Sequence, residues 1–187
     1  MNIPNTLTLL RIVLIPVLVL VFYLPVHWHF YAAFAVFSAA ALTDLLDGYL
    51  ARRLNQISAL GEFLDPVADK LMVAVVLVLL VQADPRIWLA LPAAIIIGRE
   101  ITVSALREWM AELGARSKVA VSIYGKIKTI AQMVALMLLL LREPVLGLPI
   151  YELGLVSLYV AALLTLVSMY QYLVSAWPKL RETARKQ

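Results

Sequence analysis

The sequence predicts an all-α integral membrane protein with six transmembrane helices, and three observations support this prediction. Hydrophobic residues make up 63% of the 187 positions, and the mean hydropathy is +0.90, whereas soluble domains are about half apolar. Apolar stretches of the roughly 20 residues that a helix needs to cross a bilayer recur along the chain. Short connections between them indicate a single membrane domain over 1–187. We expect the spans at 7–25, 30–50, 62–83, 87–111, 120–141 and 150–176.

The first stretch is interpreted as a membrane span rather than a signal peptide. Arg11, its only early positive charge, lies inside the apolar run, and no small-residue cleavage site follows. Pro16 is expected to bend this helix without ending it, since transmembrane helices tolerate proline. The second and third stretches carry aspartates, the fourth and fifth carry basic residues, and the sixth leads into a basic tail at 176–187.

The positions of the basic residues predict the orientation. Of the 16 Lys and Arg residues, all but Arg86 and Arg142 fall at the termini, in the second and fourth connections, or in the helix halves that lead into them. Positive charge concentrates on the cytoplasmic side of membrane proteins. We therefore expect both termini in the cytoplasm, with the basic tail on anionic lipid.

Four aspartates lie where ionisable residues are costly and therefore informative. Asp44 and Asp47 come late in the second span, and Asp65 and Asp69 come early in the third. Spacings of three and four residues put each pair on one helical face. Because the two helices run in opposite directions, all four carboxylates are expected at one depth, near the cytoplasmic boundary.

Four carboxylates at one depth repel each other unless positive charge lies between them. They could instead be solvated helix ends, or they could pair with Arg52, Arg53 or Lys70. The preferred interpretation is a site for divalent metal, Mg²⁺ or Mn²⁺, because these ions prefer oxygen ligands. The chain has no cysteine, and His27 and His29 are expected at the opposite membrane surface.

One string joins these residues: Asp44-x2-Asp47-Gly48-x2-Ala51-Arg52-x8-Gly61-x3-Asp65-x3-Asp69. It resembles the signature of the CDP-alcohol phosphotransferases, with every fixed position filled. The segment Asn2–Arg11 also resembles the amino end of one branch of that family, the bacterial phosphatidylglycerophosphate synthases. So do Arg99-Glu100-Ile101, Ser104–Trp109, and Gly125–Thr129 with Gln132.

The resemblance implies a six-helix fold, often a homodimer, in the bacterial inner membrane with its active site facing the cytoplasm. It implies two divalent metals held by the four aspartates, with Asp69 as general base. The implied reaction transfers a phosphatidyl group from CDP-diacylglycerol to glycerol 3-phosphate and releases CMP. Membrane lipids are the expected surroundings, and no nucleic acid is expected to bind. The resemblance places the CDP moiety near Thr8, Arg11, Asp44, Gly48, Ala51, Arg52 and Gly61.

A phosphate-bearing acceptor requires cationic partners. The candidates in the fourth and fifth spans are Arg99, Arg107, Lys126 and Lys128. Lys126 and Lys128 lie about 200° apart around a helix, so we do not expect both to contact one small ligand. Arg99 could instead pair with Glu100, and Arg116 and Lys118 could extend to lipid headgroups.

Two kinds of alternative remain open from the sequence. Within the family, cardiolipin synthases and phosphatidylinositol-phosphate synthases also accept anionic alcohols. Outside it, ion or proton transporters use buried aspartates. The acid cluster lies near one membrane surface rather than at the midplane, and no repeated pair of broken helices is present, so the enzyme is preferred.

Overall fold

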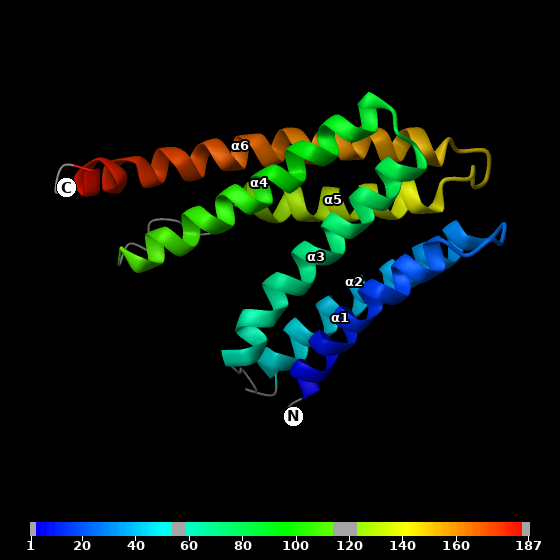
Figure 1. The fold of residues 1–187 in the computed structure, drawn as a ribbon, viewed down its shortest axis with the longest axis horizontal. Coiled ribbons are helices and arrows are strands. Elements are labelled where there is room, and N and C mark those ends of the chain that lie inside the picture. Colours follow the sequence, from blue (N-terminus) through cyan, green and yellow to red (C-terminus); the bar gives the residue numbers. More distant parts are fainter. Residues whose placement is uncertain (1–2, 54–58, 114–122, 185–187) are drawn as a thin grey trace. The chain divides into compact units, whose positions relative to one another are not determined.

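The computed structural model describes residues 3–53, 59–113 and 123–184, and these form six α-helices with no β-sheet (Figure 1). The helices alternate with the short connections expected from the sequence. The bounds are α1 Ile3–Phe22, α2 His29–Arg53, α3 Ala59–Ala83, α4 Ile87–Glu112, α5 Ile123–Leu141 and α6 Ile150–Ala184. The order and approximate bounds of the six predicted helices are thereby confirmed.

Three helices are long and apolar enough to cross a membrane, judged by length and composition. These segments are Asn5–Phe22 in α1, Ile87–Glu112 in α4 and Ile150–Trp177 in α6, and Ile127–Leu141 in α5 is a shorter apolar helix. The first helix runs through Pro16 without ending, as expected. The last helix continues beyond the predicted span into the basic tail, where the Arg181 guanidinium lies 5.2 Å from the centroid of the Trp177 ring.

The chain divides into two compact units. The first unit comprises Met1–Pro85 with Leu136–Gly154, and the second comprises Arg86–Ala135 with Leu155–Gln187. In the first unit, α1 packs against both α2 and α3. The amino end of α1, the carboxyl end of α2 and the amino end of α3 lie together at one end of this unit (Figure 1).

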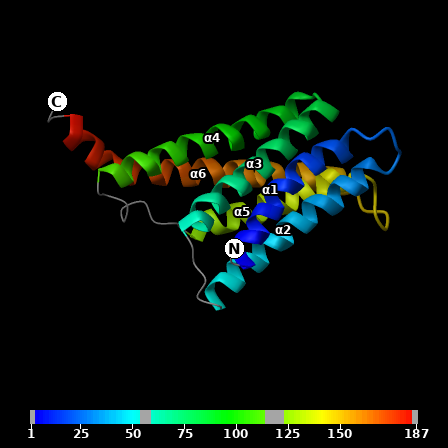
Figure 2. The same ribbon diagram turned by 60° about the horizontal axis from the view of Figure 1, so that its bottom comes forward.

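In the second unit, α4 and α6 lie side by side in both views (Figures 1 and 2). Apolar side chains of the two helices form a buried cluster between them. The helices therefore bring residues of the last span against the basic side chains of α4. The cluster consists of Val103, Leu106, Met110, Tyr172 and Ala176, with Met169 packed against it.

The connection between α5 and α6 turns within eight residues. Arg142, Leu146 and Gly147 have positive φ angles of 58°, 55° and 79°, a conformation that glycine adopts without steric cost. After this turn, α6 approaches α5 closely at Gly154. A Cβ atom there would lie 2.9 Å from Leu139 Cγ, so the close contact requires glycine.

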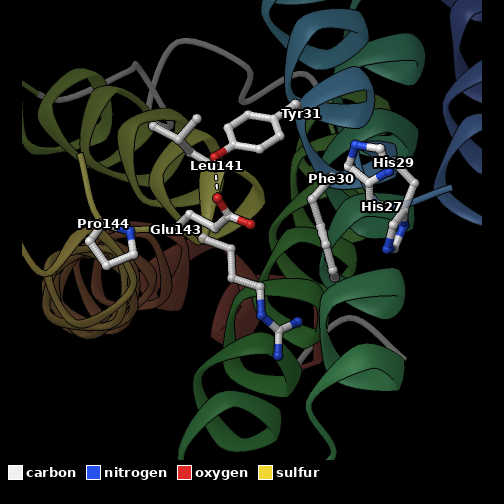
Figure 3. Close-up of a pocket in the computed structure, with 8 residues that line it drawn as sticks. His27, His29, Phe30, Tyr31, Leu141, Glu143 and Pro144 are labelled. Carbon is white, nitrogen blue, oxygen red and sulfur yellow. Dashed lines mark hydrogen bonds between the residues drawn. The ribbon is translucent and has the colours of Figure 1, made fainter.

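At the end of the first unit opposite the amino end of α1, hydrogen bonds from two tyrosines tie the connections between helices together. Tyr31 donates a hydrogen bond of 2.5 Å to Glu143 Oε2, and the Tyr151 hydroxyl donates to Asp84. A pocket of about 370 Å³ lies here (Figure 3). It contains none of the predicted site residues; it is lined by His27, His29, Phe30, Tyr31, Leu141, Arg142, Glu143 and Pro144.

Candidate active site

Helix α1 presents two buried polar side chains to its neighbours. Thr8 and Arg11 are each only 1% exposed, and their spacing of three residues puts them on one helical face. Thr8 Oγ1 donates a hydrogen bond of 2.5 Å to Asp65 Oδ1. Arg11 Nη1 lies 2.6 Å from Asp69 Oδ1 and 3.0 Å from Asp44 Oδ1. One face of α1 therefore gathers three aspartates from two other helices.

The spacing of the aspartates explains how they meet. Asp65 and Asp69 are one turn apart on α3, so both face α1. Asp44 reaches the same arginine from α2. Gly61, one turn before Asp65, is buried. Contacts with one face of α1 thus connect three of the four predicted carboxylates, which we call the acid cluster: Asp44, Asp65 and Asp69.

Arg11 contacts two carboxylates of the acid cluster, a role that the sequence analysis did not give it. Arg11 was expected to contact the donor, whereas Arg52, Arg53 and Lys70 were considered as carboxylate partners. The structure shows that Arg11 is also a carboxylate partner. Its side chain is 2% exposed, while those of Asp44 and Asp69 are 34% and 46% exposed. The arginine is therefore sequestered while the carboxylates remain accessible from one side.

The carboxylate oxygens suit a divalent metal by their chemistry. Two of them, from Asp44 and Asp69, already converge on one positively charged atom, Arg11 Nη1, and hard oxygen donors are what Mg²⁺ and Mn²⁺ prefer. Among the described side chains, no three His, Cys, Asp or Glu residues lie close enough together to hold a metal. The fourth predicted ligand, Asp47, lies outside those side chains, as do Gly48, Ala51 and Arg52.

The second unit contains a separate polar cluster around Glu100. Its carboxylate accepts hydrogen bonds from Arg99 Nη1 at 3.0 Å and from Lys128 Nζ at 2.9 Å. Arg99 and Lys128 are 7% and 5% exposed, so both charges are nearly removed from solvent. The pairing of Arg99 with Glu100, considered from the sequence, is confirmed. We call Arg99, Glu100, Arg107 and Lys128 the basic cluster.

Helix α6 supplies further partners to the basic cluster. Arg99 Nη2 donates a hydrogen bond of 2.8 Å to Ser168 Oγ, and Arg107 Nη2 donates to the Tyr172 hydroxyl. Sequence reasoning did not identify Ser168 or Tyr172. The signal was available as polar residues three and four positions apart in an apolar span: Thr165, Ser168 and Tyr172. Lys126, Arg116 and Lys118 lie outside the described side chains.

The family model for CDP-alcohol phosphatidyltransferases matches residues 1–176. The chain belongs to this family. The match covers α1 to α5, most of α6 and both clusters, so the family resemblance seen in the signature string is confirmed over nearly the whole chain.

Curated relatives are similar over almost their full length. A protein of Pseudomonas fluorescens is 57% identical over 188 aligned residues, covering 100% of this chain and 96% of the relative. Proteins of Escherichia coli strain K12 and Shigella flexneri are also 57% identical, with 94% of each chain covered. All three are named CDP-diacylglycerol–glycerol-3-phosphate 3-phosphatidyltransferase.

Proposed function

We propose that this chain transfers the phosphatidyl group of CDP-diacylglycerol to sn-glycerol 3-phosphate, giving phosphatidylglycerophosphate and CMP. The observation that carries the proposal is 57% identity, over nearly the whole chain, to relatives named for this reaction. The acid cluster and the basic cluster agree with it in chemistry. An aspartate-based ion transporter has no comparable support.

The reaction breaks the phosphoanhydride bond of the donor and forms a phosphoester bond to the acceptor. The primary hydroxyl of the acceptor attacks the phosphorus that carries the diacylglycerol group. A new P–O bond forms to the acceptor, and the P–O bond to CMP breaks. Asp69 accepts the hydroxyl proton, a contribution that is typically about 10²–10⁴-fold in rate for a general base. Its side chain is 46% exposed, so an incoming hydroxyl can reach it.

The donor carries an anionic pyrophosphate beside a cluster of carboxylates, so positive charge must lie between them. Two divalent metals held by Asp44, Asp47, Asp65 and Asp69 supply that charge when bound and stabilise the charge that develops on the leaving group. Thr8 and Arg11 orient three of these carboxylates. The cytidine end is assigned to the neighbouring positions Gly48, Ala51, Arg52 and Gly61.

The acceptor phosphate is assigned to the basic cluster, with Lys126 as a further candidate. Arg99, Arg107 and Lys128 together carry more positive charge than Glu100 neutralises, which favours binding of an anion. Arginine forms paired hydrogen bonds with phosphate oxygens. An anionic alcohol is therefore preferred over a neutral one.

The membrane arrangement is part of the same proposal. The chain crosses the bacterial inner membrane six times, with both termini and the active site on the cytoplasmic side. The asymmetric distribution of Lys and Arg supports this orientation, and three helices already meet the length and apolarity that a span requires. The active form is a homodimer, as the family resemblance implies.

The deciding experiment measures CMP release by the purified protein with CDP-diacylglycerol and Mg²⁺ or Mn²⁺. Separate reactions contain glycerol 3-phosphate, inositol phosphate, phosphatidylglycerol or no acceptor. The expected result is release that depends on glycerol 3-phosphate and stops on chelation of the metal. Release with inositol phosphate or phosphatidylglycerol instead would keep the family and replace the acceptor. Absence of release with every acceptor, from folded protein, would overturn the proposal.

A further inference from the structure

The last helix carries a buried polar face inside the second unit. Thr165 and Ser168 are fully buried, and Tyr172 is 6% exposed. Their spacings of three and four residues place them on one side of α6. Polar groups are costly in an apolar helix unless they have hydrogen-bonding partners. Their presence here therefore calls for an explanation beyond packing.

Two of these side chains hold the two arginines of α4. Ser168 Oγ accepts from Arg99 Nη2 at 2.8 Å, and the Tyr172 hydroxyl accepts from Arg107 Nη2. The Tyr172 ring also lies 4.9 Å from Arg107 Cζ and 5.9 Å from Arg99 Cζ, measured to the ring centroid. One tyrosine thus contacts both guanidinium groups, by a hydrogen bond to one and through its ring to both.

The two arginines need such support for different reasons. Arg107 is exposed, so without a partner its long side chain would sample many rotamers, and ordering it costs up to about 2 kcal/mol. Arg99 is buried, and its Nε has no hydrogen-bonding partner among the described residues. The basic cluster thus retains unused hydrogen-bonding capacity in its interior.

We propose that Ser168 and Tyr172 are positioning residues for the acceptor phosphate, acting through Arg99 and Arg107. The inference rests on the proposed function, which assigns that phosphate to the basic cluster. Helix α6 thereby contributes to acceptor recognition although it carries none of the family's signature residues. Neither residue needs to touch the acceptor, since each acts by fixing the direction in which an arginine presents its N–H groups.

Two variants test the proposal, and the same helix provides a matched control for each. Tyr172→Phe keeps the ring and removes the hydroxyl that accepts from Arg107. Ser168→Ala removes the hydroxyl that accepts from Arg99. Tyr170→Phe is the control for the tyrosine, because Tyr170 is 69% exposed. Ser175→Ala is the control for the serine, because Ser175 is exposed and donates its hydroxyl to Gln171 O within the helix.

The expected result is a rise of about tenfold in the KM for glycerol 3-phosphate for Tyr172→Phe and Ser168→Ala, the size expected for one hydrogen bond to a charged group. The KM for CDP-diacylglycerol and the kcat should stay close to those of the wild type. Ser168→Ala also leaves the buried Arg99 Nη2 without this partner, so a lower melting temperature is expected for that variant alone. Both control variants should match the wild type throughout. A purely structural role would instead change both KM values together.

A second measurement asks whether Tyr172 acts through Arg107. In an Arg107→Gln background, Tyr172→Phe should add little to the KM for glycerol 3-phosphate, because coupled residues are not additive. Full additivity would overturn the proposal, as would kinetics of both test variants equal to those of their controls. If the wild type instead released CMP without any dependence on glycerol 3-phosphate, the proposed function would fail first.

Discussion

At the scale of single residues, Arg11 decides how the acid cluster is held. Its guanidinium contacts Asp44 and Asp69 with Nη1, and a charged hydrogen bond of this kind is worth about 1.5–3 kcal/mol. In Arg11→Gln, the carboxylates lose this cation and repel each other. We expect a melting temperature several degrees below the wild type in EDTA, and a larger gain on adding Mn²⁺. An unchanged melting temperature in EDTA would show that Arg11 is not needed for the cluster.

Asp69 has two roles in the proposed mechanism, and a substitution can separate them. In Asp69→Asn, the amide oxygen can still accept the hydrogen bond from Arg11, but the side chain can no longer take a proton. We expect CMP release to fall by about 10²–10⁴-fold, while CDP-diacylglycerol binding is largely retained. Near-normal turnover would refute the base assignment.

The control for this variant is Asp84→Asn. Asp84 lies in the same unit and accepts a hydrogen bond from the Tyr151 hydroxyl, and an amide oxygen can accept that bond as well. This variant should keep the wild-type rate, because Asp84 follows the carboxyl end of α3, whereas Asp69 lies near its amino end. A loss of rate in both variants would point to damage to the unit rather than to loss of a base.

The sequence predicted which of these residues share a helical face better than it predicted which side chains they contact. The spacing of Asp65 and Asp69 predicted a shared face, because that depends only on the helical repeat. The contact between Arg11 and Asp69 joins positions 58 residues apart, and no local rule specifies it. For the same reason, the sequence offered Glu100 by name as a possible partner of Arg99, whereas a partner on a neighbouring helix could be considered only in general and Ser168 could not be named.

At the scale of helices, the sequence predicted well which helices exist and in what order, because apolar runs separated by short polar connections determine both. It predicted contacts between helices poorly. Nothing in the local sequence indicated that Gly154 of α6 would pack closely against Leu139 of α5. Helix packing of this kind depends on where small residues face a neighbour, which only the folded chain defines.

The close contact at Gly154 predicts that alanine destabilises the protein at this position but not at Gly98. A Cβ at Gly154 would lie 2.9 Å from Leu139 Cγ and 3.1 Å from its backbone nitrogen, so Gly154→Ala should destabilise the fold by about 1–3 kcal/mol. Gly98→Ala is the matched control: nothing lies within 4 Å of a Cβ there. Since alanine favours helix over glycine by about 1 kcal/mol, this variant should melt at or above the wild-type temperature. Equal melting temperatures for the two variants would contradict the close approach.

At the scale of the whole molecule, the two charged clusters lie in different compact units. The first unit holds the acid cluster, and the second holds the basic cluster. The sequence predicted both sets because charges within apolar spans are rare and conspicuous. The positions of the basic residues also predict the orientation, in which Arg86 and Arg142 face away from the cytoplasm while the basic tail faces it.

The absence of cysteine from the chain makes this orientation directly measurable. Leu146, in the α5–α6 connection, is 97% exposed, and Arg181, near the end of α6, is exposed as well. Single variants Leu146→Cys and Arg181→Cys each introduce one thiol. With a membrane-impermeant maleimide added to intact cells, Leu146→Cys should be labelled at once, whereas Arg181→Cys should react only after the inner membrane is permeabilised. The reverse pattern would invert the topology and place the acid cluster on the wrong side for a cytoplasmic acceptor. Labelling of both thiols in intact cells would place the two positions on the same side of the membrane, which would contradict α6 as a single span between them and hence the six-span arrangement.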